Sequence, residues 1–200
     1  RWKWIVFWLC LPIIALYLFL FVGDDELAPR NVWGVTFSKP YTEFLGLNWK
    51  DTYLATLDDL RVTNIRIPLY WNEVEPENDV FKFDDYVFML QEAEKRGVGV
   101  ILVVGNKVPR WPECYAPSWT AKANSKAYEE QLLNLVRTEI ETFKQFNVVS
   151  MWQVENEPFL NFFGNCSRIS GDLLQREIHE VRRIDDRPIL ITDSGELSPW

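Results

Sequence analysis

An amide and two carboxylates stand together where an apolar run of the sequence stops. Residues 151–154 read as a buried strand, and Glu155, Asn156 and Glu157 follow directly, before Pro158. Pro158 has no backbone N–H, so a sheet ladder cannot continue through it. A carboxylic acid at such a place can protonate the leaving oxygen of a glycosidic bond, and an amide beside it can hydrogen-bond a sugar hydroxyl. The spacing therefore predicts acid–base chemistry at this strand end, with Glu157 as the acid.

Three further charged residues lie in or after apolar runs. Arg66 stands within NIRIPLYW, where its charge needs a partner, so it either supports catalysis or forms a structural ion pair. Glu196 follows the last apolar run and is interpreted as a substrate contact or a loop acid. Glu155 precedes Asn156 and Glu157 and is interpreted as a buried, hydrogen-bonded carboxylate.

Several tryptophans also lie at or just beyond apolar runs. Aromatic rings can stack on the apolar C–H faces of sugars, and they can equally fill a core. Trp111 and Trp119 fall in the polar, proline-rich stretch KVPRWPECYAPSW, so we expect them to bind substrate. Trp152 lies within an apolar run and is expected to be a core residue.

Composition argues against several other classes of site. His179 is the only histidine and stands in the charged segment REIHEVRR, and there is no CxxC motif, so no metal site is expected. The first expected strand, residues 31–37, is not followed by a glycine-rich phosphate turn such as GxGxxG, and no cofactor is expected. The net charge of −8, with acidic and basic residues interspersed, argues against a nucleic-acid partner.

The elements that would position these residues alternate along the chain. Helical spacing of apolar residues alternates with short apolar runs, which is typical of an α/β protein with a parallel sheet. An open doubly wound sheet and a (β/α)8 (TIM) barrel are both compatible with this order. The long aromatic-rich loops after strands favour the barrel. The expected strands are 31–37, 64–71, 98–105, 148–154 and 187–193, and the expected helices are 51–62, 83–97, 125–146 and 170–186.

One segment resembles a known family signature. WQVENEP resembles the Asn-Glu-Pro signature of the large clan of (β/α)8-barrel glycoside hydrolases that includes cellulases, β-mannanases, xylanases and β-galactosidases. NIRIPLYWNEVEPENDVFKFDDYVFMLQEAEKRGVGVIL is similar to their second-strand region, with Arg66 on the strand. The resemblance implies that Glu157 is the general acid/base, that Asn156 binds the sugar 2-hydroxyl, and that hydrolysis retains configuration. It places the nucleophile, a second Glu, at the end of a seventh strand.

The first 23 residues differ in character from the rest. Arg1 and Lys3 precede a nearly uncharged apolar run over residues 4–22, which predicts a transmembrane signal-anchor rather than a cleaved signal peptide. Residues 24–30 are expected to be a linker, and residues 31–200 an extracytoplasmic domain at the cell surface or in the periplasm. In that setting Cys114 and Cys166 either pair, tying two loops together, or remain free thiols.

These observations together predict a membrane-anchored retaining glycosidase that acts on β-linked oligo- or polysaccharides. A membrane-anchored carbohydrate-binding pseudoenzyme and a purely structural tethered protein are the alternatives. Five strands are fewer than the eight of a barrel, so the domain is expected to be incomplete, with its nucleophile beyond Trp200. The 200-residue chain alone is accordingly expected to aggregate or to remain molten and inactive.

Overall fold

The protein is described by a computed structural model over residues 1–21, 33–160, 163–164, 166 and 169–193. The chain divides into two compact units, Arg1–Val32 and Trp33–Trp200. Each unit is described by itself. Glu196 lies outside the described residues, so its predicted role stays a prediction.

The first unit contains one helix, α1 (Trp2–Phe21), over the apolar run. Within the described part of the chain, no helix is both long and apolar enough to cross a membrane. The structure therefore does not support the predicted transmembrane signal-anchor through residues 4–22.

The second unit is built on a parallel sheet whose strands follow one another in chain order. Each strand pairs with the next along the chain, as neighbouring strands do around a barrel. A doubly wound sheet would instead reverse its strand order at a switch point. The sheet is thus consistent with part of a (β/α)8 barrel. The strands are β1 (Gly34–Thr36), β2 (Asn64–Pro68), β3 (Gly99–Val104), β4 (Val149–Val154) and β5 (Ile189–Leu190).

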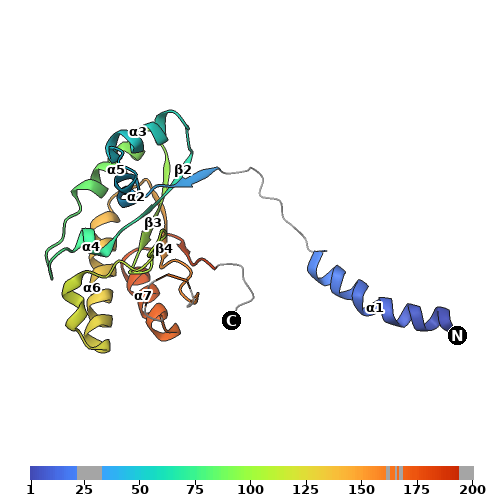
Figure 1. Cartoon of the computed structure of the whole chain (residues 1–200). Coiled ribbons are helices and arrows are strands. Elements are labelled where there is room, and N and C mark those ends of the chain that lie inside the picture. The colour runs from blue at the N-terminus through green and yellow to red at the C-terminus, as the bar shows by residue number, and fades with distance from the viewer. Residues whose placement is uncertain (22–32, 161–162, 165, 167–168, 194–200) are drawn as a thin grey trace. The chain divides into compact units, whose positions relative to one another are not determined.

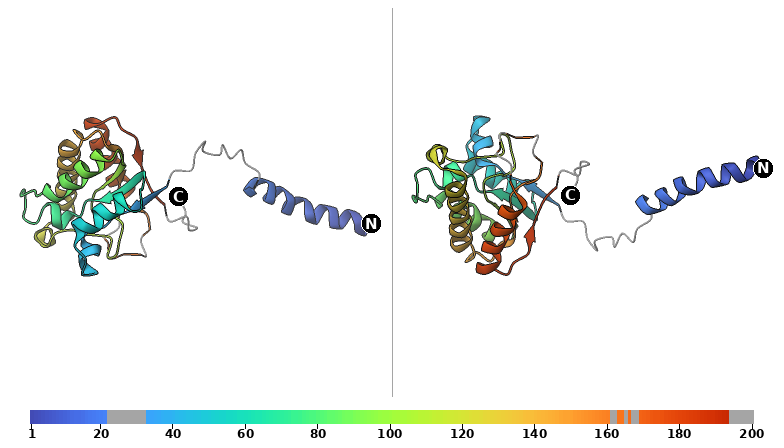
Figure 2. Two further views of the ribbon diagram at one scale, coloured as in Figure 1. Left: turned by 90° about the horizontal axis from the view of Figure 1, so that it is seen from above. Right: turned by 90° about the horizontal axis from the view of Figure 1, so that it is seen from below.

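Helices connect the strands and cover one face of the sheet (Figures 1 and 2). The four expected helices are present as α3 (Trp49–Asp58), α5 (Asp84–Lys95), α6 (Ser125–Phe143) and α7 (Gly171–Ile184). Asn48, Asn124 and Ser170 fix the starts of α3, α6 and α7, because each side chain accepts hydrogen bonds from first-turn N–H groups. Three short elements were not expected: α2 (Lys39–Phe44), α4 (Trp71–Val74) and the 3-10 helix η1 (Ser118–Lys122).

The two faces of the sheet carry different side chains. Alternate residues such as Ile65, Leu102 and Trp152 are buried against the helices in the main hydrophobic core. Trp152 is therefore a core residue, as predicted. The intervening residues Arg66 and Gln153 lie on the opposite face, which is the interior face of a barrel. This alternation places a charge and an amide on the face of the sheet opposite the helices.

Candidate active site

The turn after β4 has an unusual backbone. Glu155 and Glu157 have φ values of 58° and 46°, and in the loop after β3 Arg110 and Glu113 have φ values of 95° and 70°. The left-handed region is unfavourable for residues with a Cβ atom, and such residues tend to occur at functional sites. Four of the six non-glycine residues with positive φ in the described part of the chain thus lie in these two loops.

Glu155 joins the ends of β3 and β4. Its buried carboxylate accepts hydrogen bonds from the backbone N–H of Asn106, at 2.9 Å, and of Lys107. It also lies so close to Gly105, whose φ is 105°, that a Cβ there would fall 2.5 Å from Glu155 Oε1. Only glycine fits that position. Glu155 is thus the buried, hydrogen-bonded carboxylate that the sequence predicted, and it is not available to a ligand.

Asn156 is almost completely buried, and both the oxygen and the nitrogen of its side-chain amide form hydrogen bonds. Its Oδ1 accepts from Gln153 Nε2 at 3.3 Å and from Thr192 Oγ1 at 3.5 Å. Its Nδ2 donates to Glu113 Oε1 at 3.4 Å. Two acceptor contacts and one donor contact fix which way the amide faces. Among the described residues, one amide hydrogen of Asn156 has no acceptor and remains for another one.

Glu157 differs from the other two strand-end acids. Its backbone is anchored, because its N–H donates to Thr192 Oγ1 at 3.0 Å and its carbonyl oxygen accepts from Lys107 Nζ at 2.8 Å. Its side chain is partly exposed, and no described residue donates a hydrogen bond to its carboxylate. The main chain is therefore fixed while the acid stays open to a ligand.

Arg66 lies on β2 with its guanidinium inside the barrel. Its Nε donates to Thr36 Oγ1 at 2.9 Å and its Nη1 to Gln153 Oε1 at 3.2 Å. Burial lowers the pKa of Arg66, and the negative charge of Glu157 opposes that shift. Among the described residues Arg66 forms no ion pair within 4.0 Å, so it is a hydrogen-bonded cation in the field of Glu157.

Sequence reasoning missed four residues that hold this arrangement. Gln153 is fully buried and links Arg66 to Asn156. Thr192 lies just after β5, and its hydroxyl group contacts the turn after β4. Lys107 and Glu113 come from the loop after β3 and contact Glu157 and Asn156. A buried glutamine in the apolar run VVSMWQV is the one signal that the sequence offered, because a buried amide needs partners.

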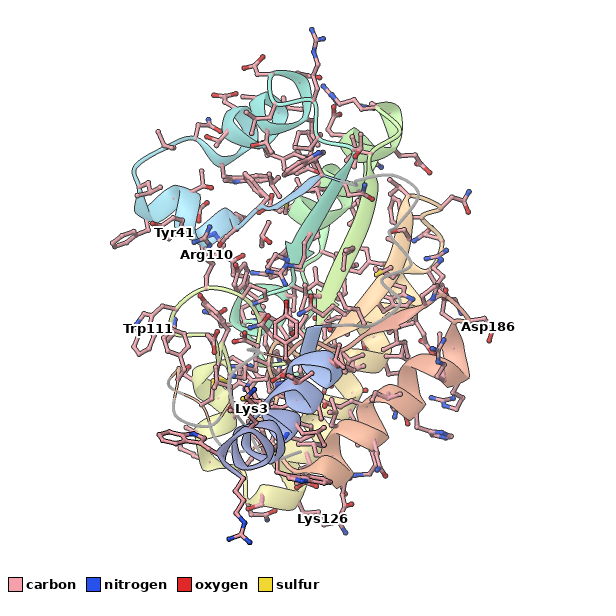
Figure 3. The ribbon with its side chains drawn as sticks, turned by 90° about the vertical axis from the view of Figure 1, so that its right-hand side faces the viewer. Lys3, Tyr41, Arg110, Trp111, Lys126 and Asp186 are labelled. Atoms are coloured by element: carbon pink, nitrogen blue, oxygen red, sulfur yellow. A yellow bond between two sulfur atoms is a disulfide. The ribbon has the colours of Figure 1, made fainter. Side chains whose placement is uncertain are left out.

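An apolar cavity of about 440 Å³ is formed by α2 and the loop after β3. Tyr41, Phe44, Arg110, Trp111 and Tyr115 line it together with two prolines. The Arg110 guanidinium lies over the Tyr41 ring, 4.6 Å from its centroid (Figure 3). Trp111 is 67% exposed. Exposed rings beside a charged, planar donor suit a sugar or another flat polar ligand. Trp111 thus lines an open apolar cavity, and its role in substrate binding stays a prediction.

Trp119 occupies a different environment. Its indole N–H donates to the carbonyl oxygen of Glu75 at 3.0 Å, and its ring packs edge-on against Trp71, with centroids 6.0 Å apart. It belongs to the partly buried residues around the main core. These contacts are those of a core aromatic residue, and we do not include Trp119 in the candidate site.

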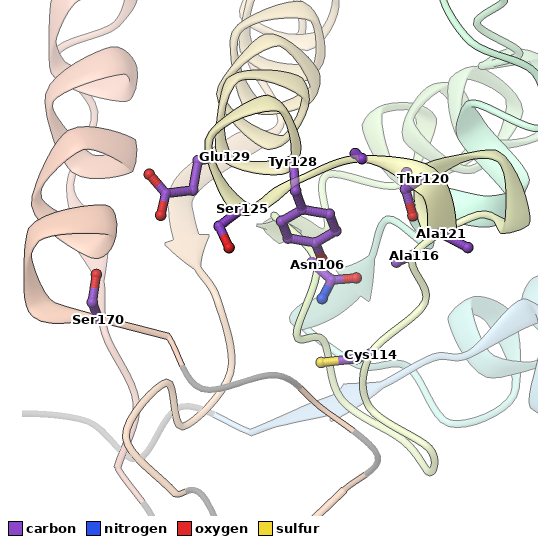
Figure 4. A pocket seen from close by; sticks show the side chains of 10 residues that line it. Asn106, Cys114, Ala116, Thr120, Ala121, Ser125, Tyr128, Glu129 and Ser170 are labelled. Carbon is purple, nitrogen blue, oxygen red and sulfur yellow. The ribbon is translucent and has the colours of Figure 1, made fainter.

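A second cavity, of about 650 Å³, lies between the loop after β3 and the first turns of α6 and α7 (Figure 4). Asn106, Tyr128, Glu129 and Ser170 are among its lining residues. Its walls are formed mostly by small and polar side chains.

In the described part of the chain, no group of three or more His, Cys, Asp or Glu side chains is arranged to hold a metal ion.

A disulfide closes the candidate site on one side. Cys114, in the loop after β3, is bonded to Cys166, in the loop after β4, and the two Cα atoms are 5.3 Å apart. The pairing that the sequence left open is thus present. It fixes the segment that contains Glu113 against the segment that follows Glu157.

Several solved structures of glycoside hydrolases are similar to this chain. GH5_18 from Streptomyces cattleya, solved in complex with GlcNAc, has 16% sequence identity and a TM-score of 0.65 over 82% of this chain and 44% of its own. The exo-β-1,4-mannosidase Op5Man5 from Opitutaceae bacterium strain TAV5 has 14% identity and a TM-score of 0.60 over 76% of this chain and 29% of its own. A family 39 glycoside hydrolase from Bacteroides cellulosilyticus WH2 has 20% identity and a TM-score of 0.52 over 79% and 30%.

The fold is similar to part of a glycoside hydrolase barrel. The chain spans less than half the length of each of these structures. No protein-family model matches the sequence, and no curated protein matches it. At these identities the likeness concerns the fold, and fold alone does not fix function.

Proposed function

We propose that this chain is the acid/base-bearing part of a retaining glycosidase that cleaves β-linked glycans. The observation that supports it most is the difference between neighbouring acids at the end of β4. Glu155 is buried and hydrogen-bonded, whereas Glu157 has a fixed backbone and an open carboxyl group beside Arg66 and Asn156. A general acid needs this combination of a fixed position and access to ligand.

In the proposed reaction, Glu157 donates its proton to the glycosidic oxygen as the bond from that oxygen to the anomeric carbon breaks. A second carboxylate forms a bond to the anomeric carbon from the opposite face. Glu157 then takes a proton from water while the water oxygen displaces the second carboxylate, which restores both groups. We propose that this carboxylate comes from the end of a seventh strand, as the family resemblance implies.

The remaining residues of the site have supporting roles in this proposal. The free amide hydrogen of Asn156 would donate to the sugar 2-hydroxyl, and Arg66 would balance the charge of Glu157 between the two steps. Trp111 would stack on a sugar ring. β-Mannosides are the first substrates to test, because one of the structural neighbours is named as an exo-β-1,4-mannosidase.

We also propose that the domain works outside the cytoplasm. The Cys114–Cys166 disulfide supports this, since such bonds persist in oxidising compartments and are rare in the cytosol.

Glu157→Gln tests the function in the protein as its gene encodes it. Phenyl and 2,4-dinitrophenyl β-glycosides, beginning with β-mannosides, are the probes. The variant should lose about 10²–10⁴-fold of kcat/KM on the phenyl glycoside, whose leaving group needs a proton, and far less on the dinitrophenyl glycoside. Equal losses on both would remove Glu157 from the acid role. Sugar binding without hydrolysis by the unaltered protein would instead favour the carbohydrate-binding pseudoenzyme.

A further inference from the structure

A lysine lies almost fully buried directly beneath the β4 turn. Lys107 is 1% exposed, although a buried ammonium group is costly unless every N–H is paired. Its Nζ donates to the carbonyl oxygens of Glu157 at 2.8 Å and of Leu160 at 3.1 Å. It also forms an ion pair with Glu113 Oε2 at 3.2 Å. The ammonium group thus lies within 3.2 Å of three oxygens, two of them in the turn after β4.

Glu113 completes the arrangement from the other side of Asn156. Its Oε1 accepts from Asn156 Nδ2, and its side chain is 5% exposed. The backbone holds it in place: Val108 N–H donates to the Glu113 carbonyl at 2.8 Å, and Glu113 N–H donates to the Arg110 carbonyl at 2.7 Å. The backbone of Glu113 has a φ of 70°, in the left-handed region. The loop therefore keeps Glu113 at this position despite a conformational cost.

Gly164, in the loop after β4, also packs against Glu113. Gly164 has a φ of 86°, and a Cβ there would lie 3.0 Å from Glu113 Oε2 and 3.3 Å from Cys166 Sγ. Cys114, next to Glu113, is bonded to Cys166. Glu113 is therefore enclosed by the disulfide, by Gly164 and by Lys107, with little space in which to turn.

We propose that Lys107 and Glu113 are a positioning pair that sets the orientation of the proposed acid and of the amide beside it. Lys107 acts on the main chain of Glu157, and Glu113 acts on the side chain of Asn156. Neither residue needs to touch the substrate. This inference rests on the proposed function, and it adds the means by which the loop after β3 controls the geometry of the β4 turn.

Glu113 has a second consequence for specificity. Because a carboxylate only accepts hydrogen bonds, it requires the N–H end of the Asn156 amide to face it. The Oδ1 end is held by Gln153 and Thr192. The site therefore presents Asn156 to a ligand as a donor through its second amide hydrogen. A glutamine at position 113 could accept or donate, so it would allow the Asn156 amide to flip.

The test uses Glu113→Gln and Lys107→Met in the protein as its gene encodes it, with the same phenyl and dinitrophenyl β-glycosides. A displaced acid protonates the leaving oxygen poorly, and a misplacement of about 1 Å can cost about 10²-fold in rate. Each variant should therefore lose at least about 10-fold of kcat/KM on the phenyl glycoside and less than about 3-fold of kcat/KM on the dinitrophenyl glycoside, because kcat/KM reports the step in which the leaving oxygen is protonated. Glu113→Gln nearly preserves shape, so it decides the question alone if Lys107→Met does not fold.

Asp58→Asn is the matched control, because it makes the same carboxylate-to-amide change in an exposed pair with Arg96 at the ends of α3 and α5. It should leave both rates unchanged. Equal losses on both substrates, or no loss in Glu113→Gln, would overturn the positioning role. If Glu157→Gln itself shows no dependence on the leaving group, the proposed function fails and the positioning role fails with it. If Glu157→Gln shows the dependence and Glu113→Gln does not, only the positioning role fails.

Discussion

The guanidinium of Arg66 on β2 donates to the side-chain oxygen of Gln153 on β4 over 3.2 Å, on the face of the sheet opposite the helices. The two strands are not neighbours, because β3 lies between them. This hydrogen bond therefore crosses the curved interior of the sheet. It connects the cation near Glu157 with the amide that orients Asn156.

Gln153→Leu should destabilise the protein more than a usual single substitution. Leucine has a similar volume but removes the acceptor of Arg66 and the donor to Asn156, which leaves polar groups unpaired in a mostly buried site. We expect the free energy of unfolding to fall by about 2–4 kcal/mol in urea titrations. Gln175→Leu, at an exposed position on α7, should change it by less than about 0.5 kcal/mol. Similar effects of the two substitutions would show that the buried network contributes little.

Three buried glutamates lie behind the site. Glu139, Glu155 and Glu177 are each fully buried, and Glu155 and Glu177 interact electrostatically. Burial raises the pKa of all three, and the charge of Glu155 raises that of Glu177 further. The folded protein thus retains protons that the unfolded chain releases above about pH 4.3. The contribution of this cluster to stability should be greatest below that pH and should fall as the pH rises toward the raised pKa values.

Glu177→Gln should therefore stabilise the protein, and more so at high pH. Glutamine has nearly the same shape as glutamate and adds no buried charge. We expect the free energy of unfolding to rise at pH 8 and to change less at pH 5. Glu94→Gln, at an exposed position on α5, should change it by less than about 0.5 kcal/mol at both pH values. A gain in the free energy of unfolding that is independent of pH would contradict the retention of protons by this cluster in the folded protein.

The disulfide between Cys114 and Cys166 closes a long stretch of chain, since 52 positions separate the two residues. A bond of this kind restricts the unfolded chain and typically contributes about 2–4 kcal/mol. The double variant Cys114→Ala, Cys166→Ala should accordingly have a lower melting temperature, and a reductant should lower the melting temperature of the unaltered protein to a similar value. Cys10→Ser serves as the control, and melting of that variant should respond to reductant as the unaltered protein does. No response to reductant would mean that the bond does not form in solution.

Trp111 and Trp119 should respond in opposite ways to replacement by alanine. Trp111→Ala should weaken sugar binding by about 1–2 kcal/mol and leave stability nearly unchanged, because its ring is exposed beside the apolar cavity. Trp119→Ala should lower the free energy of unfolding by about 3 kcal/mol, because its ring packs on Trp71. Calorimetric titration with a β-linked disaccharide and thermal melts of both variants measure the difference. The reverse pattern would restore Trp119 to the binding site.

Periodicity in the sequence was sufficient for the main elements of the domain. The apolar runs became β1 to β5, and the helical repeats became α3, α5, α6 and α7. The short helices α2 and α4 have too few residues for a helical repeat to be recognised. For α2 a weak signal was present: Ser38 caps the helix and Pro40 stands in its first turn.

The site was predictable only in part, for a physical reason. Glu157 and Asn156 follow each other in one motif, so local sequence was enough to find them. Lys107 and Glu113 act through contacts with residues more than 40 positions away, and nothing local marks such contacts. Trp119 stands in the same polar loop as Trp111, and only the fold determines which of the two rings is packed inside.

The most direct measurement replaces Glu157 by glycine and supplies azide. Glycine suits the φ of 46° at this position, so the side chain is removed without strain. With a dinitrophenyl β-glycoside, a second carboxylate can still form the glycosyl-enzyme, because the leaving group needs no proton. Water then reacts slowly without its base, whereas azide, which has no proton to lose, attacks in its place.

We predict that azide raises the rate of Glu157→Gly and that the product is the β-glycosyl azide, with configuration retained. Asp79→Gly is the matched control, since Asp79 also has a positive φ, of 61°, in a surface loop, and it should give no glycosyl azide. Absence of any glycosyl azide from Glu157→Gly, or formation of the α-azide, would contradict Glu157 as the acid/base of a retaining glycosidase.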